Sequence, residues 1–211
     1  MTRRLLQFRR SPNSIKVRIA LNVKGLDYEA TEMSSADRQP MIEAAGWPLV
    51  PILIDDRVVM RDSAAILHYL EANYREGPSL TPTDRDELRN AERIVTAVNA
   101  EVLPIQWSLL SEIQKPEEER DPAHAAEARR AAVAALSRLE ERIATREWLV
   151  GDTMSLYDVI LGANLLPLRA PAEFVEQSPM WGYFTENLRI EEERPHVSAW
   201  VGRVVAHDGL A

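Results

Sequence analysis

The pattern of apolar and polar positions divides the chain into a first part of mixed strands and helices and a second part of helices alone. In the first 76 residues, short apolar runs alternate with amphipathic stretches. The expected elements are a strand at 4–8, a helix at 14–25, a strand at 27–33, a helix or irregular loop at 36–46, a hairpin over 51–60 and a helix at 62–74. This order, βαβ and then ββα, predicts an α/β layer arrangement.

Strand signals disappear after residue 76. A stretch rich in Pro, Ser and Thr follows and predicts a linker. Beyond it the expected helices are 84–113 with Pro104 as a possible bend, 123–145, 155–166, a stretch around 174–188, and 197–205. We therefore expect an α/β domain over 1–76, a linker over 77–83 and an all-helical domain over 84–211.

Composition excludes several classes of protein. The chain has 211 residues, 45% of them hydrophobic, and no cysteine. It therefore has no disulfide, no thiolate metal site and no cysteine nucleophile for thiol–disulfide exchange. The four histidines lack metal-ligand spacing, so no metal is expected. No apolar run could span a bilayer, and the basic N-terminus lacks a signal-peptide core, so we expect a cytoplasmic protein.

Charge is unevenly distributed along the chain. The net charge of −8 argues against a nucleic-acid partner. Residues 1–80 are nearly balanced, with 11 Lys and Arg against 10 Asp and Glu, whereas the remainder has 14 against 23. The first part contains a basic cluster made of Arg3, Arg4, Arg9, Arg10, Lys16 and Arg18. This cluster is either a solvated face or an attractive field around an anionic small molecule.

Ser11 is the first candidate for chemistry. Ser11-Pro12 is a strong helix-start signal, because the hydroxyl can cap an orphan N–H and proline presets φ. The same position, between a strand and a helix N-terminus, also favours an anion. A serine that donates a hydrogen bond to an anion needs no base, so the lack of a neighbouring histidine is no objection.

Two further stretches are candidates for ligand contacts. Pro51 opens an apolar strand, and a cis bond before it would expose the backbone of Val50 to an extended ligand. Asp62 is either only a helix cap or, with Ser63, part of a carboxylate receptor at a helix N-terminus.

The order and spacing of these stretches resemble a known family. SPNSIKVRIAL, then VPIL, then DSAAILHYL are similar to the thioredoxin-like domain of cytosolic glutathione transferases, and GDTMSLYD is similar to a helix start in their C-terminal domain. The resemblance covers essentially the whole chain and is greatest for the serine-type members, the zeta and tau-like and related bacterial groups.

The resemblance implies a role for each candidate. Ser11 would hydrogen-bond the glutathione sulfur and favour its thiolate. Lowering a thiol pKa by about two units requires roughly 2.7 kcal/mol. One charge-assisted hydrogen bond of about 1.5–3 kcal/mol and a helix N-terminus of up to about 1 kcal/mol would supply it. Val50, before a cis Pro51, would pair with the cysteinyl backbone. The ligand's γ-glutamyl end would meet Asp62 and Ser63, with Asn13 and Ser14 as further contacts.

Two stretches depart from the zeta pattern. Gly46-Trp47-Pro48-Leu49 replaces polar residues that usually include a Lys, so the glycyl carboxylate has no obvious partner, although Arg10 is a candidate. Ser11-Pro12-Asn13 replaces Ser-Ser-Cys, which argues against a maleylacetoacetate isomerase.

In the second part, folding explains most of the polar signals. Ser155 and Asp158 form an S-x-x-D capping box, and Tyr157 is expected to pack against a neighbour. The apolar stripe around Trp107 is typical of a core, but in the family the same helix lines the electrophile site. Gln106, Trp107 and Ser111 are therefore the candidate substrate contacts.

The leading interpretation is a dimeric glutathione transferase that attacks a small apolar electrophile with glutathione thiolate. Isomerisation or reductive dehalogenation would use the same thiolate. The alternative from another class is a non-catalytic relative that serves as an interaction or regulatory module.

Overall fold

The computed structural model describes residues 3–209, and the chain forms two compact units. The first unit contains the residues up to Thr81 together with those from Val204 onward. The second unit is Pro82–Arg203. Each is described by itself below.

A mixed four-stranded sheet forms the centre of the first unit. Its strands are β1 (Arg3–Gln7), β2 (Glu29–Glu32), β3 (Ile52–Asp55) and β4 (Val58–Arg61), in the spatial order β2-β1-β3-β4. β1 runs parallel to β2 and antiparallel to β3, and the predicted hairpin is the antiparallel pair β3 and β4. The thioredoxin-like βαβαββα order is therefore confirmed.

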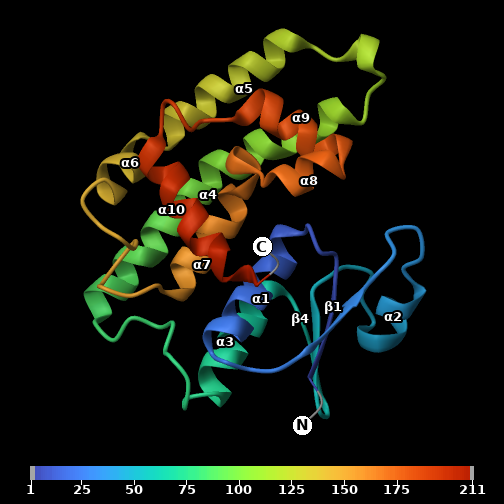
Figure 1. Ribbon diagram of the computed structural model, residues 1–211, viewed down its shortest axis with the longest axis vertical. Helices are drawn as coiled ribbons and strands as arrows, with labels where there is room; N and C mark the ends of the chain where they lie inside the picture. The colour runs from blue at the N-terminus through green and yellow to red at the C-terminus, as the bar shows by residue number, and fades with distance from the viewer. Residues whose placement is uncertain (1–2, 210–211) are drawn as a thin grey trace. The chain divides into compact units, whose positions relative to one another are not determined.

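Helices cover both faces of this sheet. α1 (Pro12–Val23) and α3 (Ser63–Asn73) lie on one side, and α2 (Gln39–Ala45) lies on the other (Figure 1). Alternation along β1 explains the two layers, because Leu6 packs with Met41 of α2 and the neighbouring Leu5 faces the opposite side.

α2 resolves the open prediction for 36–46 in favour of a helix. Its Pro40 lies in the first turn, where the missing N–H costs nothing, and Gly46 ends it in the left-handed conformation at φ 62°.

The end of the chain packs with the first unit. Asp208 of η3 (Ala206–Asp208) forms an ion pair with Arg18 of α1 at 2.7 Å, and Asn22 donates to the His207 carbonyl at 2.9 Å. The expected domain over 84–211 includes these residues, whereas the compact unit that contains them is the first. The pairing of Asp208 with Arg18, 190 residues earlier, leaves no signal in the sequence, because a single aspartate forms no pattern.

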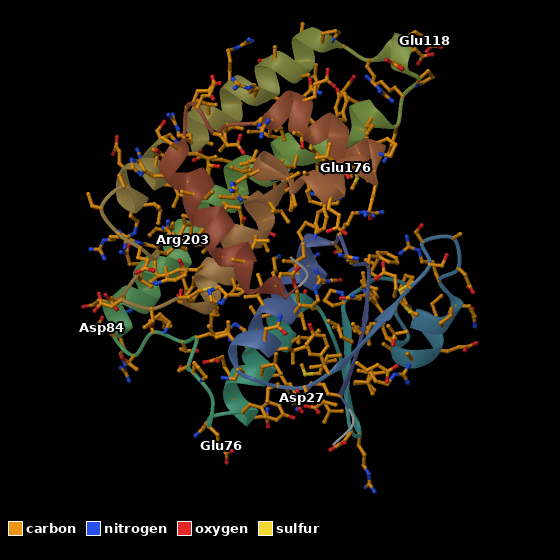
Figure 2. All side chains as sticks on the ribbon, in the orientation of Figure 1. Asp27, Glu76, Asp84, Glu118, Glu176 and Arg203 are labelled. Atoms are coloured by element: carbon orange, nitrogen blue, oxygen red, sulfur yellow. The ribbon has the colours of Figure 1, made fainter. Side chains whose placement is uncertain are left out.

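The second unit contains only helices. They are α4 (Arg85–Ile113), η1 (Glu117–Glu119), α5 (Pro122–Ala135), α6 (Ser137–Ile143), α7 (Leu156–Leu165), η2 (Leu166–Arg169), α8 (Ala172–Glu176), α9 (Pro179–Leu188) and α10 (Pro195–Val205), whose last two residues belong to the first unit. Asp84 begins α4 by accepting hydrogen bonds from the N–H groups of Asp86 and Glu87 (Figure 2). Pro104 lies inside α4 and does not end it.

Two predicted helices are each split in two. The alanine-rich helix expected over 123–145 is interrupted at Leu136, where Arg194 donates to the Val133 carbonyl and so replaces the helical N–H. The segment 174–188 is divided between α8 and α9, and Pro179 starts the second helix. Local pattern predicts neither break, because Arg194 is distant in sequence and Pro179 lies within a stretch expected to be one helix.

The capping box at α7 is confirmed. The Ser155 hydroxyl accepts from the Asp158 N–H, and the Asp158 carboxylate accepts from the Ser155 N–H. Asp158 also accepts from Leu149 and from the Trp200 indole, so it joins three segments. Tyr157 packs as predicted, buried and with its hydroxyl donating to Glu92 at 3.1 Å.

No helix among the described residues is long and apolar enough to cross a membrane. Within residues 3–209, no three His, Asp or Glu side chains are grouped so that they could hold a metal ion.

Candidate functional site

Ser11 caps α1 with its backbone only. Its carbonyl accepts from the Ile15 N–H at 2.9 Å, and its N–H donates to the Phe8 carbonyl at 2.9 Å. The side chain is half-buried and makes no capping hydrogen bond. The hydroxyl therefore remains available at the positive end of a helix of 12 residues.

Arg18 fixes the loop that precedes Ser11. Its guanidinium donates to the Arg9 carbonyl at 2.8 Å and to the Gln7 side chain at 2.6 Å. Two further bonds of 2.7 Å go to the Asp208 carboxylate. Arg18 is completely buried, so this carboxylate is needed to balance its charge.

The N-termini of α1 and α3 meet through two polar side chains. The Ser63 hydroxyl donates to Asn13 Oδ1 at 3.4 Å, and the Lys16 ammonium donates to the same oxygen at 2.8 Å. Ser63 and Lys16 are buried and Asn13 is exposed. Two helix N-termini with hydroxyl and amide groups between them form a receptor suited to a carboxylate.

Asp62 holds the start of α3. Its φ of 73° lies in a region that residues other than glycine rarely adopt, and its carboxylate accepts from the Ala65 N–H at 2.9 Å. The predicted cap is therefore confirmed. This conformation turns the chain from β4 into α3 and places the Ser63 N–H in the first turn.

The bond between Val50 and Pro51 is cis, as the resemblance implied. Val50 is half-buried, and Pro51 is buried. Neither backbone group of Val50 has a hydrogen-bond partner within residues 3–209. These groups, just before the start of β3, can therefore pair with the backbone of an extended ligand that lies beside them.

A positively charged side chain lies beside the stretch 46–49, which has no charged residue of its own. Arg38 donates to the Pro48 carbonyl at 3.0 Å, and its guanidinium lies 5.1 Å from the centre of the Phe8 ring. Arg38 could not be predicted from the sequence, because it lies 10 residues before Pro48 and belongs to no motif.

The basic cluster is only partly a surface feature. Arg4 is exposed, but Arg3 pairs with Asp55 at 3.4 Å, Arg18 pairs with Asp208, and Lys16 is buried. A solvated face is therefore wrong for these three. Lys16 and Arg18 lie on α1, whose residues Ser14–Leu21 are all buried, whereas Arg3 lies on β1.

The remaining predicted residues are placed as follows. Ser14 is completely buried, and its hydroxyl has no hydrogen-bond partner in the described part of the chain. On α4, Gln106 donates to the Asn164 carbonyl, Ser111 donates to the Trp107 carbonyl, and Trp107 is 65% exposed. A cavity of about 410 Å³ in the second unit contains none of them and is lined by α4, α5 and α6. The electrophile contacts remain predictions.

Comparison with known proteins agrees with this architecture. Residues 5–79 match the description "Glutathione S-transferase, N-terminal domain", and residues 122–203 match "Glutathione S-transferase, C-terminal domain". A probable glutathione S-transferase from Oryza sativa subsp. japonica is 32% identical over 165 residues, which is 74% of this chain and 67% of the rice protein.

Solved structures share the fold. A tau class glutathione S-transferase from mango, Mangifera indica, superposes with a TM-score of 0.75 at 22% identity over 97% of this chain and 89% of the mango chain. A theta class glutathione S-transferase from Xanthomonas axonopodis pv. citri, with glutathione bound, gives a TM-score of 0.73 at 24% identity over 100% of this chain and 98% of that chain. The sequence motifs, the βαβαββα sheet and the helical second unit have one explanation, which is that the chain belongs to the glutathione S-transferase family.

Proposed function

We propose that this protein is a glutathione transferase in which Ser11 stabilises the thiolate of glutathione. The thiol proton leaves to solvent, the sulfur forms a bond to an electrophilic carbon, and the leaving group departs with its electron pair. Ser11 donates its O–H to the sulfur throughout and does not itself become a nucleophile.

The observation that carries this proposal is the unused hydroxyl of Ser11. Folding does not require it, because the side chain makes no capping hydrogen bond. A hydrogen bond from this group to a thiolate contributes about 1.5–3 kcal/mol. The helix N-terminus adds up to about 1 kcal/mol. Together these lower a thiol pKa by about two units, which makes most of the bound thiol anionic at neutral pH.

The rest of the peptide has matching partners in the first unit. The free backbone groups of Val50 suit the cysteinyl moiety, and Ser63 with Asn13 suits the γ-glutamyl carboxylate. Arg38 supplies a positive charge beside the 46–49 stretch for the glycyl carboxylate.

Calorimetry with glutathione, followed by ultraviolet titration of the bound thiolate, tests the proposal. We expect wild-type protein to bind glutathione and to lower its thiol pKa. Ser11→Ala should bind with nearly the same affinity and raise the bound thiol pKa by about one to two units, since the helix N-terminus remains. Ser14→Ala is the matched control, since Ser14 is completely buried, and should leave the pKa unchanged.

Two results would count against the proposal. Absence of binding at millimolar glutathione would favour the non-catalytic interaction module. An unchanged thiol pKa in Ser11→Ala would exclude Ser11 as the thiolate's hydrogen-bond donor.

The role of Arg38 has its own test. Arg38→Met should weaken glutathione binding by about tenfold, the loss expected for one charge-assisted hydrogen bond. Binding of γ-glutamylcysteine, which lacks the glycyl carboxylate, should change little. Equal losses for both ligands would indicate that Arg38 only supports the loop around Pro48.

We also propose that the protein is a homodimer. Trp47, Leu49, Val58 and Val59 expose 41–49% of their surface within one short region of the chain. Val58 and Val59 are neighbours on β4 and point to opposite faces of the sheet, so exposed apolar side chains lie on both faces there, and such side chains are typical of an interaction surface. Analytical ultracentrifugation should show a dimer, and charged substitutions at Val58 and Val59 should produce a monomer.

A further inference from the structure

Lys16 of α1 and Lys24, the residue that ends this helix, have the same burial but different partners. Lys16 and Lys24 are each 6% exposed. Lys24 pairs with the Glu71 carboxylate at 2.7 Å. Lys16 has one hydrogen-bond partner among the described residues, the neutral oxygen of Asn13 at 2.8 Å, and no carboxylate within ion-pair distance. A buried ammonium without a paired anion is costly, so it calls for an explanation.

The location of Lys16 suggests what balances its charge. Asn13 Oδ1 also accepts from the Ser63 hydroxyl, so Lys16 lies behind the receptor formed by the N-termini of α1 and α3. Because Lys16 and Ser63 both donate to Asn13 Oδ1, the amide NH₂ of this exposed side chain points away from them. That NH₂ group has no partner in the described part of the chain and is a ready donor to an anion.

We propose that Lys16 is a positioning residue for the carboxylate of an α-amino acid. Lys16 attracts this carboxylate by its charge and holds Asn13 so that the Asn13 amide donates to it. This inference rests on the proposed function, in which that carboxylate belongs to the γ-glutamyl end of glutathione. The ligand adds a second negative charge to that of Asp62, so the Lys16 ammonium is fully protonated in the complex.

The proposal has a consequence for pH dependence. Burial lowers the pKa of Lys16 from 10.5 to about 8, while Asp62 acts in the opposite direction. Among the other groups near α1, Asn13 and Ser63 are neutral, and Asp208 of η3 and Gln7 of β1 are bound to Arg18. An arriving carboxylate raises the Lys16 pKa, so binding above pH 8 requires uptake of a proton.

Calorimetry with S-methylglutathione tests this without interference from thiol ionisation. For wild-type protein we expect the affinity to fall by up to about tenfold per pH unit above pH 8. Buffers of different ionisation enthalpy should show net proton uptake near this pH. Lys16→Arg keeps its positive charge at all these pH values, so its binding should show neither effect of Lys16 titration. Any pH dependence that remains in this variant comes from the amine of the ligand and can be subtracted.

Two further variants separate this role from a structural one. Lys16→Met should bind S-methylglutathione about tenfold more weakly than wild type at neutral pH. Its affinity should lack the fall above pH 8 that Lys16 titration causes in wild type. Without ligand it should have a higher thermal midpoint than wild type, because an uncompensated buried charge is gone. Lys24→Met is the matched control and should lower the midpoint, since Glu71 loses its partner, while it keeps the wild-type pH profile.

The possible failures are distinguishable. If wild-type protein binds neither glutathione nor S-methylglutathione, the proposed function is wrong and this inference falls with it. If wild-type protein binds both but Lys16→Met binds with unchanged affinity and unchanged proton uptake, only the role of Lys16 is overturned.

Discussion

Three serines stand at the N-caps of helices in the described part of the chain, Ser11, Ser155 and Ser178. Ser11 and Ser155 use their hydroxyls in opposite ways. Ser155, at α7, is 3% exposed and forms a complete capping box with Asp158. Ser11, at α1, is half-buried and leaves its hydroxyl unused. The same residue type at the same helix position therefore serves folding at α7, whereas its hydroxyl is free for a ligand at α1.

A buried aspartate supports the position of each serine. Asp158 bonds directly to Ser155 and uses up its hydroxyl. Asp208 acts at a distance, because it binds Arg18, which in turn holds the carbonyl of Arg9 two positions before Ser11. The second arrangement fixes the backbone around a serine without occupying its side chain, which is what a preorganised binding group requires.

The strongest test of the folding half of this comparison is Asp158→Ala. Burial raises the pKa of Asp158, although hydrogen bonds from Ser155, Leu149 and Trp200 act against this. Loss of the carboxylate leaves these buried donors unsatisfied, and we expect the free energy of unfolding to fall by about 4 kcal/mol. Denaturant unfolding measures this loss. Asp152→Ala, at an exposed position nearby, should change it by less than about 0.5 kcal/mol.

Asp208→Ala tests the support of the Ser11 loop. It leaves the buried Arg18 charge without its carboxylate, and we expect a loss of about 3 kcal/mol, since Arg18 keeps its bonds to Gln7 and Arg9. Because the loop relaxes, kcat for conjugation should fall more than glutathione affinity. Asp208→Asn retains hydrogen bonding and should lose less of both. A variant with full stability and full kcat would show that Asp208 does not hold the loop.

The smallest effects compare the two serines directly. Ser155→Ala removes a capping bond and should cost about 1 kcal/mol of stability, whereas Ser11→Ala removes none and should cost less than about 0.5 kcal/mol. Parallel urea titrations measure both. If Ser11→Ala destabilised the protein as much as Ser155→Ala, the Ser11 hydroxyl would be serving as a cap in solution.

Much of the first unit could be predicted because its signals are local. Apolar alternation, the Asp55-Asp56-Arg57 turn and the Asp62 cap each lie within a few residues and specify β3, β4 and α3. The Ser155–Asp158 box was equally readable, since both partners lie within one helical turn. Positions of the helix breaks at Leu136 and Pro179 were not predicted.

The candidate site was only partly predictable for the same physical reason. Ser11, Val50 and Ser63 stand in recognisable local patterns, so they could be named in advance. The roles of Arg38, Lys16 and Asp208 depend on which backbone or side chain folding brings to them. Long-range partners of this kind have no period or motif.

By itself, the sequence determined the succession of strands and helices, the helix starts at Ser11, Asp62 and Ser155, and the absence of any cysteine chemistry, because these depend on local propensity and composition. Only the tertiary structure decided which polar groups are satisfied. It gave Ser155 a complete set of partners, left the Ser11 hydroxyl unused, and buried Lys16 beside a neutral amide instead of a carboxylate. Satisfaction of a polar group depends on neighbours brought together by folding, and the unused hydroxyl of Ser11 and the free amide NH₂ of Asn13 both lie at the proposed glutathione site.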